Sequence, residues 1–230
     1  KLMASDNPEE ALALAQELDR YNTQRKDIQT GILEAALPEA RAQAEAGAKC
    51  IVVAQEGWHP GVIGIVAGKI KEELELPAFV IGSYKGRWTG SGRSIAGVNL
   101  GHHIHQAVEV GLLLKGGGHA IAGGLGIDRA RLEDFRIGIN IAVSKDMAAI
   151  GGRPAYDVHA LVSVGAVTTD FIDQLQRLAP FGQGNVTPRL ALNAVMVSGL
   201  RLVGKNQDTI ACDLVDEGRN RVGAVAFGAA

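Results

Sequence analysis

Near the middle of the chain lies the run Gly116-Gly117-Gly118-His119-Ala120-Ile121-Ala122-Gly123-Gly124. Consecutive glycines let backbone N–H groups approach a ligand without obstruction by Cβ atoms, and the small residues that follow allow a helical turn to pack closely. A phosphate set against such N–H groups gains several hydrogen bonds, and His119 adds a side-chain donor at the rim. A tight structural turn with a solvent-facing histidine explains the same residues, so the run alone leaves both interpretations open.

On both sides of this run the pattern alternates between strands and helices. We expect strands at Cys50–Ala54, Ala78–Gly82, Arg87–Gly92 and Leu125–Asp128, and helices at Pro60–Leu76, Leu100–Val110 and Arg131–Met147. This alternation predicts an α/β fold with a central sheet over residues 47–152. The segment Gly151-Gly152-Arg153-Pro154 is a plausible domain boundary.

The first 46 residues predict one long helix that connects two bodies. Asn7 suits the N-cap, Pro8 the first helical position and Glu10 the acidic position of a capping box. An apolar stripe with one charge, Arg25, continues at helical spacing to Ile32. We expect a break or bend near Gly31 or Pro38.

Residues 153–230 are mostly β in pattern. Strand signals lie at Tyr156–Val164, Leu190–Leu202, Thr209–Val215 and Arg221–Phe227, with one helix near Thr169–Leu178. Short strands around one helix are typical of a small barrel of the OB type. Four strand signals stand where such a barrel needs five, so we expect an OB-like domain that is incomplete within this chain.

The composition limits the classes of function. A net charge of −2 means that a phosphate site must be a local pocket, since no overall field attracts nucleic acid. Aromatic residues make up only 4%, so few side chains are available to stack on bases. Cys50 and Cys212 lie in apolar runs and are expected to be buried thiols. We expect a cytoplasmic protein with no membrane partner, since no apolar run is long enough to span a bilayer.

A second candidate for phosphate binding is the segment Arg87–Ser94. The predicted strand ends in Gly92-Arg93-Ser94, which offers a guanidinium fork and a hydroxyl beside an open backbone. An edge strand with a solvated arginine is the structural alternative. Because this segment and the glycine run share one domain, they could converge on one phosphate.

The segment Glu56–Gly64 ends a predicted strand and opens a helix, which is where ligands usually lie in open α/β sheets. Trp58 could stack on a base, although a packed tryptophan is the more common case. His59 could bind a phosphate, polarise a neighbour or cap the helix.

The sequence shows no catalytic or metal-binding motif. His102, His103 and His105 lack a set of convergent acidic ligands, and Glu109 is expected off the His105 face. Exposed histidines, or one tucked against the sheet, explain this cluster. We find no Asp-His-His, nucleophile elbow, P-loop or complete dinucleotide fingerprint. We therefore predict no catalytic residue and no bound cofactor in this chain.

Three segments resemble, in order and spacing, the DHHA1 domain of RecJ exonucleases: Glu56–Ala67, Gly92-Arg93-Ser94 with Asn99-Leu100, and Gly117–Gly124. Upstream, Leu18-Asp19-x-x-Asn22-x-x-Arg25 resembles the long connecting helix of that family. Downstream, Leu178–Asn185 resembles the segment that leads into its OB-like domain, although Val186-Thr187 precede Pro188 where the family usually has proline directly.

The resemblance implies the substrate-binding part of a single-strand DNA 5′→3′ exonuclease of DNA repair and recombination. It implies two-metal hydrolysis with Mn²⁺ or Mg²⁺ in a DHH catalytic domain that should precede residue 1, so the chain alone should bind single-stranded DNA without cutting it. Phosphate contact is assigned by resemblance to Arg93, Ser94, Gly117, Gly118 and His119. His59 and Arg25 are the second choices.

Two alternatives share the glycine run. One is a stand-alone DHHA1-type module that binds nucleotides or RNA, and the other is the substrate half of an oligoribonuclease or cyclic-dinucleotide phosphodiesterase. Residues 154–230 discriminate, because the β-rich extension is expected of RecJ only. The phosphate hypothesis itself requires Arg93 and His119 to lie on one surface.

Overall fold

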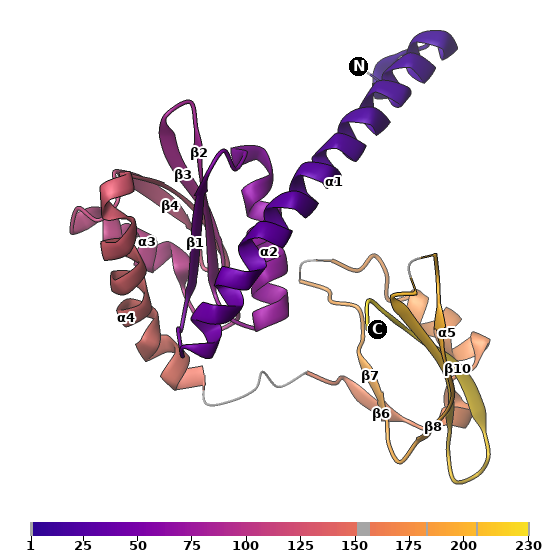
Figure 1. Ribbon diagram of the computed structural model, residues 1–230. Coiled ribbons are helices and arrows are strands. Elements are labelled where there is room, and N and C mark those ends of the chain that lie inside the picture. Colours follow the sequence, from indigo (N-terminus) through magenta and orange to yellow (C-terminus); the bar gives the residue numbers. More distant parts are fainter. Residues whose placement is uncertain (1, 151–156, 183, 206, 230) are drawn as a thin grey trace. The chain divides into compact units, whose positions relative to one another are not determined.

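The computed structural model describes residues 2–150, 157–182, 184–205 and 207–229, which form two compact units, Lys1–Gly152 and Arg153–Ala230 (Figure 1). The boundary expected at Gly151–Pro154 lies outside the described residues.

Apart from one additional strand at Lys115–His119, the helices and strands of the first unit follow the expected order. Its elements are α1 (Pro8–Glu45), β1 (Ile51–Glu56), α2 (Pro60–Leu74), β2 (Ala78–Tyr84), β3 (Arg87–Arg93), α3 (Leu100–Glu109), β4 (Lys115–His119), β5 (Ala122–Ile127) and α4 (Leu132–Ile150), with short 3₁₀ turns at Leu2–Ala4 and Arg129–Arg131. The fold class is α/β, as predicted.

Helix α1 runs through both positions where a break was expected. Asn7 accepts hydrogen bonds from the N–H groups of Glu9 and Glu10, which starts the helix as predicted. Pro38 lies inside the helix. The cost of its missing N–H is offset there because Ile32, Ala36 and Ala40 are buried against α2 and the sheet. The N-terminal half of α1 is largely exposed and extends past the sheet (Figure 1).

The central sheet has the strand order β1-β2-β3-β5-β4. Strands β1 and β2 are parallel and connected through α2, whereas the other pairs are antiparallel. One core packs α1 and α2 on one face of the sheet. The other packs α3 and α4 on the opposite face, around Phe79, Leu100 and Phe135. Three layers result, with β4 at an edge of the sheet.

The predicted glycine loop is in fact the hairpin of β4 and β5, which corrects the expectation of a helical turn after the glycines. All of β4 is exposed. Glycine is depleted in strands and β4 carries no apolar alternation, so no sequence signal marked it as a strand. Strand β5 accordingly starts at Ala122, three residues before the predicted start.

The second unit contains β6 (Ala160–Val162), a 3₁₀ turn (Val164–Ala166), α5 (Thr169–Gln176), β7 (Leu190–Leu192), β8 (Met196–Val203), β9 (Thr209–Val215) and β10 (Arg221–Phe227). The predicted strand Leu190–Leu202 is two strands, separated at Ala194, whose φ is 52°. Strands β8, β9 and β10 form an antiparallel sheet and β6 pairs with β7 in parallel. The unit is of the OB type with its sheet not closed, and Tyr156, the predicted start of β6, lies outside the described residues.

Candidate nucleic-acid-binding site

Strand pairing aligns the two predicted phosphate-binding segments. On one side Ala122 of β5 pairs with Arg93 of β3, and on the other it pairs with His119 of β4. Residues directly opposite each other in antiparallel strands present their side chains on the same face. Arg93 and His119 therefore share one face, two strand spacings or about 10 Å apart at the backbone.

That face is the one that α2 partly covers. A Cβ atom added at Gly64 of α2 would lie 2.9 Å from Nη2 of Arg93 and 2.9 Å from Oγ of Ser91. A Cβ atom at the intervening Gly92 would instead meet Phe79 and Leu100, which belong to the core on the α3 side. Arg93 and Ser91 thus project together beneath Gly64.

Beyond the edge of α2 the sheet surface is bare backbone. Two residues before Arg93 along β3, Ser91 pairs with Gly124 of β5, which in turn pairs with Gly117 of β4. A Cβ atom at Gly117 would meet nothing within 4 Å, and one at Gly124 would meet only the Gly90 carbonyl oxygen at 3.8 Å. We call Gly117 and Gly124 the glycine shelf. Arg93, Ala122 and His119 border it at one end.

Ser91 is the functional candidate that sequence reasoning missed. Nη1 of Arg93 donates to Oγ of Ser91 at 3.0 Å and to the Gly92 carbonyl oxygen at 2.8 Å. Both acceptors are neutral, so the half-buried guanidinium keeps its full charge for an anion. The period-two alternation of a strand was the available signal, because it places residue 91 beside residue 93.

Ser94 points away from this corner. Its side chain is only 6% exposed, and its hydroxyl donates to the Val98 carbonyl oxygen at 2.9 Å. The Ser94 N–H donates to the carbonyl oxygen of Ile121, which ties the end of β3 to the hairpin turn. The hydroxyl is therefore engaged within the fold, and its predicted phosphate contact stays a prediction.

Gly117 and Gly118 have different structural roles. A Cβ atom at Gly117 would point into open space, whereas one at Gly118 would overlap the backbone of Ala122 and Gly123. The close approach of the two hairpin strands thus requires glycine at 118. Only at 117 does the absence of a side chain leave space for a ligand.

His59 and Arg25, the second choices for phosphate contact, lie apart from the row of Arg93, Ala122 and His119. Nδ1 of His59 accepts the Gly61 N–H at 3.0 Å and caps α2, while its ring contacts Tyr84 edge to face. Arg25 lies on α1, where its guanidinium donates to Asn22 at 2.8 Å. Trp58 is only 5% exposed and packs in the core beneath α2, which favours the structural interpretation over stacking.

The three histidines of α3 also have structural neighbours. His103 is buried, and its Nε2 lies 2.7 Å from Oδ2 of Asp146 on α4. His105 lies 3.3 Å from Glu109, which corrects the expectation that this acid lies off its face. Among the residues that the structure describes, no three His, Cys, Asp or Glu side chains gather in a way that could hold a metal ion.

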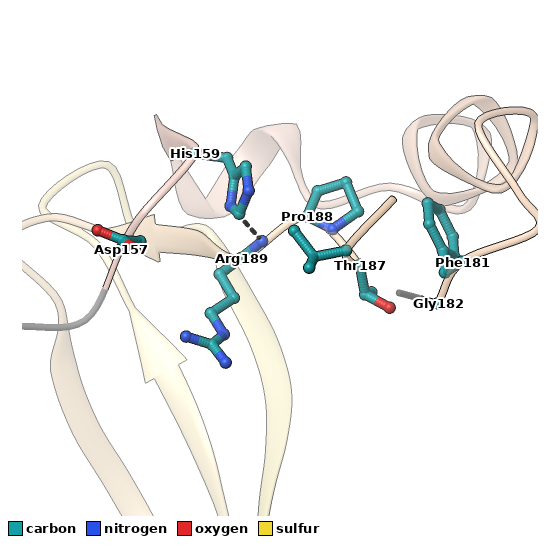
Figure 2. A pocket seen from close by; sticks show the side chains of 8 residues that line it. Asp157, His159, Phe181, Gly182, Thr187, Pro188 and Arg189 are labelled. Carbon is teal, nitrogen blue, oxygen red and sulfur yellow. Dashed lines mark hydrogen bonds between the residues drawn. The ribbon is translucent and has the colours of Figure 1, made fainter. Parts of the chain in front are cut away.

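The second unit has a pocket of its own, of about 660 Å³ (Figure 2). Phe181, Pro188, Arg189 and His159 are among the residues that line it. Nδ1 of His159 accepts the Arg189 N–H at 3.1 Å, which fixes the backbone that carries the Arg189 guanidinium (Figure 2). An arginine and a phenylalanine ring around one opening are the side chains that bind phosphates and bases of single strands.

In the described part of the chain, no helix is long and apolar enough to cross a membrane.

Family models match both units. One for the DHHA1 domain matches residues 47–145, and one for the RecJ OB domain matches residues 158–230. The second match favours RecJ over a stand-alone DHHA1 module and over an oligoribonuclease or cyclic-dinucleotide phosphodiesterase, since residues 154–230 discriminate between them.

Curated relatives agree with these matches. The chain is 30% identical over 218 residues to the single-stranded-DNA-specific exonuclease RecJ of Bacillus subtilis, an alignment covering 94% of this chain and 27% of that protein. It is 33% identical over 197 residues to RecJ of Escherichia coli, covering 79% of this chain and 33% of that protein. The chain thus spans a third or less of the length of these relatives.

The fold also matches a solved structure. The crystal structure of RecJ in complex with Mn²⁺ from Thermus thermophilus matches with a TM-score of 0.75 and 29% identity, covering 96% of this chain and 31% of that one. A Mg²⁺ complex from the same organism matches with a TM-score of 0.73. With matches to the DHHA1 and RecJ OB domain models and an alignment to a RecJ protein over 94% of its length, the chain belongs to the RecJ family.

Proposed function

We propose that this chain is the substrate-gripping part of a single-strand DNA 5′→3′ exonuclease and that its first unit holds the 5′-phosphate end of the strand. The observation that carries the proposal is the placement of Arg93, Ser91 and His119 on one face around the glycine shelf. A terminal phosphate carries more negative charge than an internal one, so a site built from two possible cations selects the end of a strand.

Each residue has a distinct part in the grip. The Arg93 guanidinium binds the phosphate through charge-assisted hydrogen bonds, and the Ser91 hydroxyl orients that guanidinium. His119 approaches the same phosphate, or its neighbour, from the other side of Ala122. Gly117 and Gly124 let the sugar-phosphate chain approach the sheet closely, and β4, as an edge strand, offers alternate N–H groups without a sheet partner.

Ser94 and Gly118 support the site without forming its surface. Ser94 ties the end of β3 to the following turn, and Gly118 lets the hairpin close. Phosphate contact by Arg25 and His59 remains a secondary proposal. It would require a DNA strand or a partner domain that reaches α1 or the start of α2.

Hydrolysis itself belongs to a DHH domain outside this chain, where Mn²⁺ or Mg²⁺ would supply the activated water. This chain's contribution is to fix how far the strand end reaches toward that water. The second unit contributes the pocket around Phe181 and Arg189 as a contact for the trailing strand. We expect the 230-residue chain alone to bind single-stranded DNA and to leave it intact when Mn²⁺ is supplied.

The decisive experiment measures binding of one oligonucleotide in two forms, with a 5′-phosphate and with a 5′-hydroxyl, by fluorescence anisotropy. We expect Arg93→Ala to reduce the preference for the phosphorylated form by about tenfold to a hundredfold, as loss of a hydrogen bond to a charged group predicts. Arg131→Ala is the matched control, because Arg131 is an exposed arginine already paired with Asp134 at 3.0 Å. Equal losses on both forms would show that Arg93 does not bind the strand end.

A further inference from the structure

A cationic pocket lies at the ends of β3, β4 and β5 that are opposite to Arg93 and His119. It has a volume of about 390 Å³ and is formed where β3 begins, β4 begins and β5 ends. Arg87, Lys115 and Arg129 contribute three positive charges to its lining, against the single carboxylate of Asp128. That carboxylate also accepts the Ala130 N–H at 3.0 Å, so it is partly engaged in capping the following turn.

The three cations of this pocket are not neutralised within the described part of the chain. None of them lies within 4 Å of a carboxylate oxygen there, whereas other arginines of the first unit, such as Arg41 and Arg136, pair with glutamates at 2.6 and 2.8 Å. Clustered cations without partners repel one another, and an anion relieves that repulsion. The pocket therefore favours a ligand with negative charge.

The pocket is better suited to a phosphate than to a base. Trp88 is its one aromatic lining residue, and the Arg129 guanidinium already lies 5.6 Å from the centre of the indole ring. Trp88 also packs against the core on the α3 side of the sheet. Its ring faces are thus engaged with protein groups.

Thr89 and Lys115 connect this pocket to the face that carries the glycine shelf. Thr89 pairs with Gly126, and Gly126 with Lys115, two residues along each strand from the row of the glycine shelf. The same alternation that places Ser91 beside Arg93 places Thr89 and Lys115 on that face. A Cβ atom at Gly126 would lie 3.1 Å from Cγ of Lys115, so the lysine stem crosses Gly126 toward β3.

The distance between the Arg93 end and the Lys115 end of this surface suits an extended single strand of DNA. His119 lies four positions after Lys115 along β4, which corresponds to roughly 13 Å at about 3.3 Å per residue. On β4 and β5 the surface between them carries no side chain larger than that of Ala122, and on β3 it carries those of Ser91 and Thr89. An elongated polyanion that is held at one end by Arg93 can therefore lie on the shelf and reach Lys115.

We propose that Arg87, Lys115 and Arg129 bind an internal phosphate of the same single strand whose 5′ end is held at Arg93, so that the first unit measures a minimum strand length. This inference rests on the proposed function, because it requires a strand end at Arg93. It adds a second phosphate subsite at the far end of the shelf and a dependence of affinity on strand length.

The test uses the 230-residue chain with 5′-phosphorylated oligothymidylates of increasing length, starting from the mononucleotide. Lys115→Gln is expected to leave mononucleotide binding unchanged and to weaken binding of the longer strands by roughly threefold to tenfold, the effect of one hydrogen-bonded contact. On those strands the slope of log affinity against log salt concentration should fall by about 0.7, the value for one phosphate of a single strand. Lys115→Arg should restore both quantities, since it keeps the charge.

Lys145→Gln is the matched control, because Lys145 is an exposed lysine on α4, on the opposite side of the sheet. Equal effects of Lys115→Gln at all lengths, or an unchanged salt slope, would overturn the subsite. Arg93→Ala measured in parallel separates the two proposals. If it lowers affinity at every length while Lys115→Gln has no effect, only the further inference fails; if Arg93→Ala itself has no effect, the proposed function fails.

Discussion

Gly64 of α2 lies so close to Arg93 of β3 that a single methyl group on it would come within 2.9 Å of the guanidinium. Helix α2 thus covers Arg93, and the absence of a side chain at Gly64 leaves the space that the guanidinium occupies.

Gly64→Ala should therefore displace Arg93 and Ser91 while leaving the fold intact, because the atoms it meets are the ends of flexible side chains. We expect the affinity for 5′-phosphorylated strands to fall by about tenfold, which corresponds to ~1.4 kcal/mol. Gly68→Ala, one turn later in the same helix, meets nothing within 4 Å and should keep full affinity. It should also raise the stability by about 0.5–1 kcal/mol, measured by chemical denaturation. If the two variants bind equally, Gly64 does not position the arginine.

The neighbouring glycines of β4 allow a second comparison. Gly117→Ala has open space around its new methyl group, so we expect unchanged thermal stability and weaker DNA binding, since the methyl stands on the shelf. Gly118→Ala should instead lower the melting temperature, because its methyl would overlap the backbone of β5. Melting curves and anisotropy titrations of the two variants check this separation. Full affinity in Gly117→Ala would mean that the strand does not lie on the shelf.

The sequence predicted the layers of the fold better than it predicted the site. Strands rich in branched residues were found, and β9 and β10 lie where the pattern placed them. β4 was missed because its residues carry no strand propensity and are held in place by pairing with β5. The break or bend expected near Gly31 or Pro38 does not interrupt α1, because Ile32, Ala36 and Ala40 are buried against α2 and the sheet. Such burial is a tertiary effect that the local sequence pattern does not contain.

The alignment of the site could not be read from the sequence for a related reason. Arg93 and His119 are brought together by a register in which both pair with Ala122, and register depends on contacts between distant segments. Ser91, in contrast, was within reach of sequence reasoning, because strand alternation places it on the Arg93 face and Ser94 on the other. The Ser94 hydroxyl donates to the Val98 carbonyl oxygen, and its phosphate contact stays a prediction.

The two cysteines should differ in reactivity. Complete burial raises the pKa of the Cys50 thiol far above its ordinary range, whereas Cys212 of β9 is partly exposed. Because the thiolate is the reactive form, a thiol reagent should modify Cys212 first and Cys50 only when the first unit opens. Mass spectrometry of the modified chain identifies the site. Rapid labelling of Cys50 in the native chain would contradict its burial.

The same raised pKa predicts a loss of stability in alkali. Above the ordinary thiol pKa of about 8.5, the unfolded chain releases the Cys50 proton while the folded chain keeps it. The unfolded state is then favoured by up to ~1.4 kcal/mol for each further pH unit, and stability falls as the pH rises. Cys50→Ala should flatten this decline in denaturation experiments between neutral pH and pH ~10, and an unchanged slope would assign the decline to other groups.

Asn140 of α4 should be important for the stability of the first unit. Its Oδ1 accepts the N–H groups of Lys49 and Cys50 at 2.7 and 3.0 Å, and its Nδ2 donates to the Cys50 carbonyl oxygen at 2.9 Å. Asn140→Ala leaves these backbone groups unsatisfied at the start of β1 and should cost about 1–3 kcal/mol. Ser144→Ala, one turn later, removes only an exposed hydroxyl and should change the unfolding free energy by less than ~0.5 kcal/mol.

The exposed glycines of β4 and β5 also bear on how a ligand is held. A side chain that is immobilised by a ligand loses rotamer freedom worth about 0.5–1.5 kcal/mol, and a residue without a side chain has none to lose. Contact with Gly117 and Gly124 therefore costs no side-chain entropy, and it involves backbone atoms that do not distinguish which base the ligand carries. Substitutions that alter sequence preference should therefore be sought elsewhere than along this strip of backbone.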